Sequence, residues 1–321
     1  MKCYFALSDD VADNDAYYWM FVATLNSARK NTSLDLHCLY DFRKKTVENI
    51  EDDRIYKLLK EYSVTVHLTT IDFEEDLLSV YTDNYLQQIN VTKSSLYSRF
   101  LRFMIADIET EDEYILYADT DVLFLKDIHL DDFVSLTSKE NKSVPKTIGV
   151  CSEESNNYEY MNFNAGIMLI NTSYYKQVKK TFLDWISHGR KARGECCDQG
   201  YLNEICERDF ERVSNVFNWK PYWGVNSDAA IVHLHGVKPT VKEGQEGEFI
   251  PFVSKYMFDN PGAKDGWFHY FDLFATYTGN SKMNTIVLNN LTVTMNAQDP
   301  DYFSFKRRVF RKLGKILGIR K

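Results

Sequence analysis

The chain has 321 residues, of which 44% are hydrophobic and 26% are charged, and its formal net charge at pH 7 is -8. These values are typical of a soluble globular protein and allow one large α/β domain with an appendage, or two small domains. Residues 305–321 contain eight Lys or Arg and no acid, so the remainder carries about -16, which is the net -8 less these eight positive charges. This distribution excludes a nucleic-acid binder with a broad basic face.

The cysteines and the first residues indicate an intracellular protein. The six cysteines show neither zinc-type spacing nor a dense disulfide pattern. The sequence begins with a strand-like stretch rather than a signal peptide, and no apolar run is long enough to span a bilayer. We therefore expect reduced thiols and a cytoplasmic location.

Short apolar runs alternate with helical patterns along the first half of the chain. The patterns predict strands at 3–7, 34–40, 64–68 and 114–118, and helices at 17–29, 47–62 and 94–108. Such an alternation is typical of an α/β fold with a mostly parallel central sheet and helices on both faces. In these sheets ligands bind at the carboxyl ends of the strands.

The alternation continues less regularly after residue 149. The patterns predict strands at 165–170 and 231–234, helices at 174–188 and 198–206, and a loop at 238–247. Residues 240–300 give no clear assignment beyond that loop. We expect a catalytic domain at 1–255 and a C-terminal extension at 256–321 that ends in a basic amphipathic helix at 305–321.

Two carboxylates follow the apolar run at 114–118, in the sequence Ala-Asp119-Thr120-Asp121. Alternate side chains of an extended chain point the same way, so Asp119 and Asp121 can face one ligand. Two neighbouring oxygen ligands suit Mg²⁺ or Mn²⁺, which can neutralise a departing diphosphate. The alternatives are a polar turn that caps the strand and the Asp-x-Asp motif of haloacid dehalogenase phosphatases, which place it near the N-terminus.

Five further motifs accompany this cluster. In chain order they are Phe-Ala6-Leu-Ser8-Asp9-Asp, Tyr-Ser-Arg99-Phe, Phe-Asn164-Ala165-Gly, Asp198-Gln199-Gly and His233-Leu-His235-Gly236-Val-Lys238-Pro. Each alone has an ordinary structural explanation: a capped turn, a surface arginine, a strand that begins at a glycine bulge, a helix N-cap and a structural strand histidine.

In this order, over about residues 1–240, the motifs resemble glycosyltransferase family 8, which includes bacterial lipopolysaccharide galactosyl- and glucosyltransferases and glycogenin. The resemblance implies the GT-A fold, a UDP-sugar donor and retention of the anomeric configuration. It implies that Asp119, Asp121 and His233 bind the metal ion. Asp198 would bind hydroxyls of the donor sugar, and Gln199 would lie near the anomeric carbon, so these two are the candidate catalytic residues.

The resemblance also implies a set of donor-binding residues. They are Ala6, Ser8, Asp9, Arg99, Asp119, Thr120, Asn164, Ala165, Gly236 and Lys238. The sequence departs from the family's pattern in three places: Ser8 stands where the family has an acid, one residue is missing before Lys238, and Thr240 replaces the usual Trp. His235 is a rival metal ligand to His233, because both would share one face of a strand.

These inferences predict a retaining hexosyltransferase that uses Mn²⁺ or Mg²⁺ and moves galactose or glucose from a UDP-sugar to a glycan or glycolipid, as in lipopolysaccharide or capsule synthesis. Gln199 is a poor nucleophile, which favours same-face attack, and Asp198 is the candidate for a covalent route. The aromatic side chains of Trp219, Tyr222 and Trp223 can form an acceptor wall or belong to the core.

The basic tail suggests an acceptor at a membrane. A basic amphipathic helix can lie on an anionic leaflet or dock on the acidic body of the protein. We expect the membrane, because bacterial members of the family often act on lipid-linked glycans. Two functional alternatives stay open: a metal-dependent phosphohydrolase with Asp119 as the nucleophile, and an inactive relative that binds sugar nucleotides.

Overall fold

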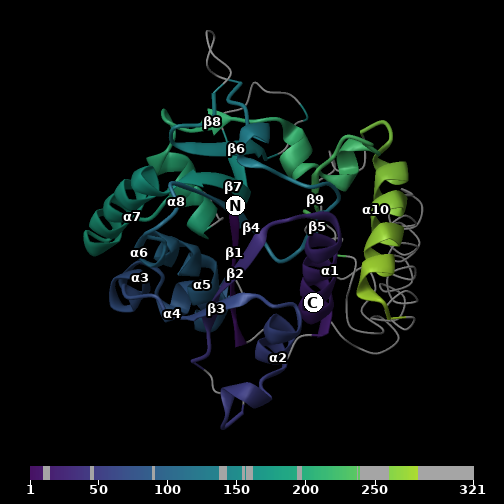
Figure 1. Cartoon of the computed structure of the whole chain (residues 1–321). Helices are drawn as coiled ribbons and strands as arrows, with labels where there is room; N and C mark the ends of the chain where they lie inside the picture. The colour runs from purple at the N-terminus through teal and green to yellow at the C-terminus, as the bar shows by residue number, and fades with distance from the viewer. Residues whose placement is uncertain are drawn as a thin grey trace, which may run out of the picture. The chain divides into compact units, whose positions relative to one another are not determined.

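The computed structural model describes residues 1–9, 15–43, 47–88, 91–136, 143–153, 156, 162–193, 197–236, 238 and 260–280 (Figure 1). The chain forms two compact units, of which the first contains Met1–Trp219 and Asp228–His233. The second contains Lys220–Ser227 and the chain from Leu234 onward. The expected boundary after residue 255 and the expected basic helix at 305–321 lie outside the described residues and stay predictions.

The first unit is built on a seven-stranded sheet in the order β3-β2-β1-β4-β7-β6-β8. The strands are β1 (Lys2–Ser8), β2 (Asp35–Asp41), β3 (Thr65–Leu68), β4 (Tyr114–Ala118), β6 (Ile148–Ser152), β7 (Phe163–Asn171) and β8 (Glu211–Arg212). β7 runs antiparallel to β4 and β6, while the other pairs are parallel. The predicted α/β fold with a mostly parallel sheet is therefore confirmed.

Helices cover both faces of this sheet (Figure 1). They are α1 (Asp15–Asn31), α2 (Arg54–Glu61), α3 (Glu74–Val80), α4 (Asp83–Gln88), α5 (Lys93–Phe100), α6 (Ile105–Ile108), α7 (Thr172–Ser187) and α8 (Cys197–Ile205). Alternate strand residues point to opposite faces, so Tyr4 packs with α3 to α8 while Cys3 and Phe5 pack with α1 and α2. This alternation gives the sheet two separate apolar cores.

Two predicted helices are divided in the structure. In the region 47–62, a short 3-10 turn, η2 (Ile50–Asp52), precedes α2. Asp53 separates them because its carboxylate caps α2, accepting a 2.7 Å hydrogen bond from the backbone N–H of Tyr56. The region 94–108 consists of α5, the 3-10 helix η3 (Leu101–Met104) and α6 rather than one continuous helix.

A second sheet pairs β5 (Val122–Phe124) with β9 (Ile231–His233) in antiparallel orientation. All six residues of this pair are buried. Helix α1 holds β5 in place: Oγ1 of Thr24 lies 2.9 Å from the carbonyl oxygen of Thr120 and 2.8 Å from that of Val122. The small sheet thus fixes the chain directly after the two predicted metal carboxylates.

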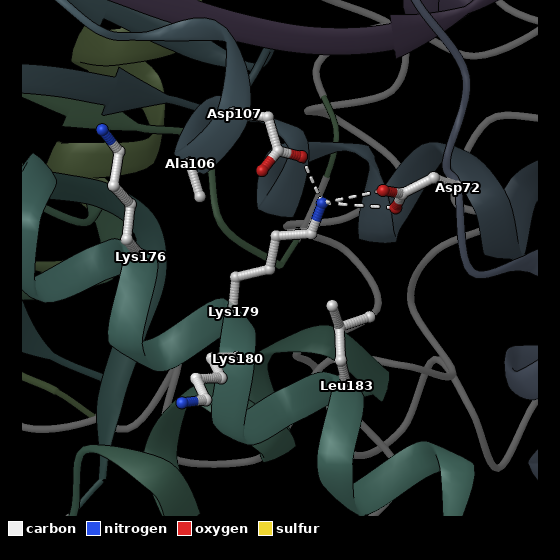
Figure 2. A pocket seen from close by; sticks show the side chains of 7 residues that line it. All are labelled: Asp72, Ala106, Asp107, Lys176, Lys179, Lys180 and Leu183. Atoms are coloured by element: carbon white, nitrogen blue, oxygen red, sulfur yellow. Dashed lines mark hydrogen bonds and ion pairs between the residues drawn. The ribbon is translucent and has the colours of Figure 1, made fainter.

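A cavity of about 270 Å³ in the first unit is lined mainly by charged residues, which come from α6, α7 and the loop before α3 (Figure 2). The buried ammonium group of Lys179 contacts the carboxylates of Asp72 and Asp107 there. Because both acids neutralise this lysine, the cluster serves to tie α7 to α6 and to the start of α3.

The described part of the second unit is organised around α10 (Ala263–Thr278), in a region that the sequence left unassigned. This helix packs against η6 (Pro221–Trp223) at very short range, since a Cβ atom on Gly266 would lie 2.0 Å from the carbonyl oxygen of Pro221. Trp267 and Tyr270 on the same face of α10 are fully buried. Among the helices that the structure describes, none combines the length and the apolar character needed to cross a membrane.

Candidate active site

Three predicted metal ligands meet where β4 ends. Asp119, Asp121 and His233 each offer one ligand atom, and these atoms all lie within 4.8 Å of one another. Nε2 of His233 is 3.4 Å from Oδ1 of Asp121. Asp121 and His233 are buried, while Asp119 is partly exposed. Two carboxylates and one imidazole at this spacing fit a divalent ion such as Mn²⁺ or Mg²⁺.

Strand pairing explains why these side chains converge. Val122 lies opposite His233 in the small sheet, and Asp121 directly precedes Val122. The backbone N–H of Asp119 donates a 2.7 Å hydrogen bond to the carbonyl oxygen of Gly166, which continues the pairing of β4 with β7 by one residue. The two sheets therefore hold the two acids and the histidine from opposite sides.

Gly166 gives the site its room. A Cβ atom on this residue would lie 2.3 Å from Cε1 of His233 and 2.8 Å from Oδ2 of Asp119. Both distances are shorter than any carbon side chain can tolerate. The glycine of the Asn-Ala-Gly motif is thus required for the histidine and the aspartate to approach each other across β7.

Asn164 lies behind His233 and is buried, with 3% of its surface exposed. Its Oδ1 atom is 3.1 Å from Nδ1 of His233, and it accepts hydrogen bonds from Nδ2 of Asn218 at 2.9 Å and from the N–H of Gly166 at 3.1 Å. Its Nδ2 atom donates to Oε2 of Glu153 at 2.7 Å. Asn164, which we expected to bind the donor sugar, here contacts a candidate metal ligand.

Arg102 on η3 joins the acids of the site. Its guanidinium donates to Oδ1 of Asp119 at 3.0 Å and to the carbonyl oxygen of Ala165 at 2.8 Å, and its Nε lies 3.0 Å from Oδ2 of Asp198. The group also lies 4.4 Å from the ring centroid of Tyr117. Burial favours loss of the charge, but the attractions of Asp198, Tyr117 and Asp119 together outweigh this effect and raise the pKa of Arg102. This arginine stays charged in the site.

The two candidate catalytic residues lie on α8 beside the metal cluster. Burial raises the pKa of the Asp198 carboxyl, and the Arg102 charge opposes that rise. Oε1 of Gln199 accepts a 2.9 Å hydrogen bond from the backbone N–H of Ala165 and lies 3.5 Å from Nδ2 of Asn164. These contacts place the Asp-Gln pair next to the Asn-Ala-Gly motif.

Ala6, Ser8 and Asp9 lie at the end of β1, on the same edge of the sheet as Asp119, because β1 and β4 are parallel neighbours. Ser8 and Asp9 are buried, with exposures of 2% and 0%. Burial raises the pKa of the Tyr40 phenol on β2, and the negative charge of Asp9 adds to this rise. These three predicted donor-binding residues thus lie at the carboxyl end of β1.

The remaining predicted residues are not part of the metal cluster. Arg99 is exposed on α5, one helical turn before Arg102. Gly236 and Lys238 belong to the second unit, where the Lys238 ammonium donates to the carbonyl oxygen of Leu234 at 3.2 Å. His235 belongs there too, and its Nδ1 lies 3.1 Å from the hydroxyl of Tyr222. The cluster of described ligand atoms contains His233 and not His235.

The aromatic side chains that were candidates for an acceptor wall are mostly hidden. Trp219, Tyr222 and Trp223 have exposures of 8%, 0% and 7%. Sequence reasoning missed Arg102, Glu153 and Asn218 as residues of the site. For Arg102 a signal existed, since a second arginine follows Arg99 by three residues. Glu153 and Asn218 lie outside every motif, and only the tertiary fold reveals them.

Comparison with solved structures shows the fold. GlyE of Streptococcus pneumoniae TIGR4, a glycosyltransferase, matches 89% of this chain with 15% identity and a TM-score of 0.53, and this chain covers 62% of GlyE. For mouse xyloside xylosyltransferase 1 the identity is 15%, the TM-score 0.50, and the coverage 75% of this chain and 99% of that one. For WbbM, a bifunctional glycosyltransferase, the identity is 12% and the TM-score 0.52, and the match covers 90% of this chain and 51% of that one. The predicted GT-A type of α/β fold is thereby confirmed.

Comparisons of the sequence identify the protein family more closely than the fold does. No curated protein matches the chain at a significant level. The family model for "Glycosyl transferase family 8", in contrast, matches residues 11–239. This range takes in every described element from α1 to β9, including the Asp119, Asp121 and His233 cluster. The chain therefore belongs to glycosyltransferase family 8.

Proposed function

We propose that this glycosyltransferase is a retaining, metal-dependent hexosyltransferase that moves galactose or glucose from a UDP-sugar to a glycan or glycolipid acceptor. The observation that carries the proposal is the convergence of Asp119, Asp121 and His233 at the carboxyl end of β4. Open α/β sheets bind their ligands at this edge. The family model supports the same class of reaction.

The three side chains fit a divalent cation by their chemistry. Asp119 and Asp121 would supply hard oxygen ligands, and His233 would supply a neutral nitrogen, a set that suits Mn²⁺ and also accepts Mg²⁺. A bound ion of this kind supplies positive charge to the diphosphate of the departing UDP. Lys238 is expected to add further positive charge to the same phosphates.

Arg102 and Gln199 keep the reacting groups in place. Arg102 forms ion pairs with both Asp119 and Asp198, so a metal ligand and a candidate sugar-binding acid keep a fixed spacing. The side-chain oxygen Oε1 of Gln199 accepts a hydrogen bond from the N–H of Ala165. A carboxamide is a poor nucleophile and Asp198 is buried in an ion pair, so we favour same-face attack. The leaving phosphate then accepts the proton of the acceptor hydroxyl.

The test is a calorimetric titration of UDP into the protein with and without Mn²⁺. We expect Mn²⁺-dependent binding that Asp121→Ala weakens by at least ~100-fold, because the variant removes one of three protein ligands. Asp228→Ala is the matched control, since this aspartate has an 82% exposed side chain in a surface ion pair with Lys126. It should leave the affinity for UDP unchanged.

A panel of UDP-sugars scored for UDP release then identifies the donor, with UDP-galactose and UDP-glucose expected to react fastest. Failure of UDP to bind under either condition contradicts the proposal. In that case the Asp119 cluster is tested for phosphate release from phosphomonoesters, as a phosphohydrolase would show.

The proposal also covers the acceptor and the cellular location of the enzyme. We infer that the enzyme works in the cytoplasm at an anionic membrane surface, held there by the basic residues at 305–321, and that its acceptor is linked to lipid. Support comes from the sequence alone, which contains eight basic residues and no acid in this segment.

A further inference from the structure

The Asn164 side chain uses its entire hydrogen-bonding capacity inside the protein. A carboxamide offers two N–H donors and one oxygen with two lone pairs. The two donor hydrogens have acceptors in Glu153 at 2.7 Å and Gln199 at 3.5 Å. The oxygen faces three groups, on Gly166, Asn218 and His233. With 3% of its surface exposed, Asn164 offers little to an external sugar.

The orientation of this amide follows from its neighbours. The backbone N–H of Gly166 can only donate, so the Asn164 atom that faces it is the oxygen. A carboxylate oxygen accepts hydrogen bonds, so the Asn164 atom that faces Oε2 of Glu153 is the nitrogen. Two independent contacts therefore agree on one orientation of the amide.

This orientation determines the tautomer of His233. Nδ1 of the imidazole lies 3.1 Å from Oδ1 of Asn164 and 3.2 Å from Oδ1 of Asn218, and both atoms are acceptors. Nδ1 must therefore carry the proton and donate it. Nε2 of the neutral ring then keeps its lone pair on the side of Asp121, 3.4 Å away. A metal ion needs that lone pair.

We propose that Glu153, Asn164 and Asn218 form a relay that holds His233 as its Nδ1–H tautomer and so sets the affinity of the site for Mn²⁺. In this assignment Asn164 is a positioning residue for a metal ligand. Glu153, next to the end of β6, anchors the relay through its carboxylate. The inference rests on the proposed function, because it takes Asp119, Asp121 and His233 as the metal site.

The test measures Mn²⁺ binding without UDP, by calorimetry and by the electron paramagnetic resonance signal of the free ion. Asn164→Leu keeps the branched shape of the side chain and removes every side-chain hydrogen bond. Loss of a partner behind a ligating histidine typically weakens metal binding 10- to 100-fold, and we expect about this loss. Glu153→Gln retains an acceptor for the amide and should change the affinity less than about threefold.

An exchanged pair of residues separates positioning from simple packing. In Asn164→Asp/Glu153→Gln, a carboxylate faces Nδ1 of His233, and the new Gln amide can donate to its second oxygen. Only the bond between residues 164 and 153 then reverses its direction, while the oxygen at position 164 still accepts from Gly166, Asn218 and His233, so the double variant should recover the wild-type affinity or exceed it. A carboxylate behind the imidazole also raises the basicity of the ligand.

Asn203→Leu is the matched control. Asn203 bonds the N–H and C=O of Phe163, the residue next to Asn164, at 2.8 and 2.9 Å, but has no contact with His233. It should lower stability without changing the affinity for Mn²⁺. In nitrogen-detected imidazole spectra of the metal-free protein, the wild type and the exchanged pair should show an Nδ1–H ring, which Asn164→Leu should lose.

The outcomes are distinct. If the wild type binds Mn²⁺ in a manner that needs Asp121, and Asn164→Leu binds it equally well, the relay is overturned while the proposed function stands. A variant that keeps Mn²⁺ affinity and weakens only the binding of the UDP-sugar restores Asn164 to a sugar contact. If the wild type binds no Mn²⁺, the relay and the proposed function both fail.

Discussion

Gly166 is the residue at which the site tolerates least change. Gly166→Ala places a carbon atom 2.3 Å from His233 and 2.8 Å from Asp119, so one of the two ligands must move. We expect the variant to fold and to lose Mn²⁺-dependent UDP binding by ~100-fold or more, because the ligand set is broken on one side. Calorimetry on the purified variant measures this loss.

Gly189→Ala separates the effect of crowding from that of a glycine replacement. Gly189 has a positive φ of 70°, and none of the described atoms lies within 4 Å of the position that a methyl group would take there. The exchange should cost about 1 kcal/mol of stability, from the left-handed backbone, and leave UDP binding intact. Equal loss of binding in both variants would contradict a local clash at Gly166.

Single residues of the site differ in how well the sequence predicts them. Asp119 and Asp121 could be predicted because they follow a buried strand, where backbone geometry alone directs them to the sheet edge. Arg102 was missed because the sequence shows two arginines about one helical turn apart and does not tell which of them faces the acids. In the structure Arg102 meets Asp119 and Asp198, whereas Arg99 is exposed.

At the scale of elements, Glu109 connects the start of β1 to the loop before β4. Burial alone would raise its pKa, but hydrogen bonds from the N–H groups of Asp112 and Glu111 and from the side chains of Tyr4 and Lys2 lower it to about 2. A carboxyl whose pKa is depressed on folding stabilises the protein above its unfolded pKa. That stabilisation disappears as the pH falls through the folded pKa.

Glu109→Gln should therefore destabilise the protein by about 3 kcal/mol at pH 7, from a shift of roughly 2.5 units at 1.36 kcal/mol each. The difference in the free energy of unfolding between the variant and the wild type should narrow as the pH falls from about 4.5 towards 2, where the folded and the unfolded wild type both bind the proton. Urea unfolding at several pH values measures this difference. Glu111→Gln is the control, because its side chain is 80% exposed, and it should cost less than about 1 kcal/mol.

Elements were predictable where a clear apolar or amphipathic run marks them in the sequence. The periodic apolar runs locate β1, β2, β4 and β7 to within two residues. Strands β5, β6 and β8 were missed, and of these β5 and β8, with three and two residues, carry no period of their own and pair only through the tertiary fold. Helix α10 was missed because its own apolar side chains occupy most of its circumference, so the sequence shows no distinct apolar stripe with a helical period.

At the scale of the whole molecule, the basic tail and the acidic body have opposite charge, and the tail is testable independently of the active site. Replacing Arg307, Arg308, Arg311 and Lys312 by Gln should weaken binding to anionic phospholipid vesicles by about 4 kcal/mol, at about 1 kcal/mol per basic residue. Co-sedimentation with vesicles of phosphatidylglycerol and phosphatidylcholine measures this change.

Vesicles of phosphatidylcholine alone are the control and should retain little protein. High salt should release the wild type from anionic vesicles, because screening removes the attraction. Equal binding by the wild type and the four-fold variant contradicts a role for the tail at membranes and leaves docking on the acidic body as its function.

The pairing of Val122 with His233 has a consequence for the order of events during synthesis. The two residues are roughly 110 positions apart, so this contact closes a long loop, which costs entropy and forms slowly. A ribosome-bound chain that ends before β9 already has both aspartates but lacks the imidazole. The last ligand of the proposed metal site is therefore added only once β9, the last of the described strands, has been synthesised.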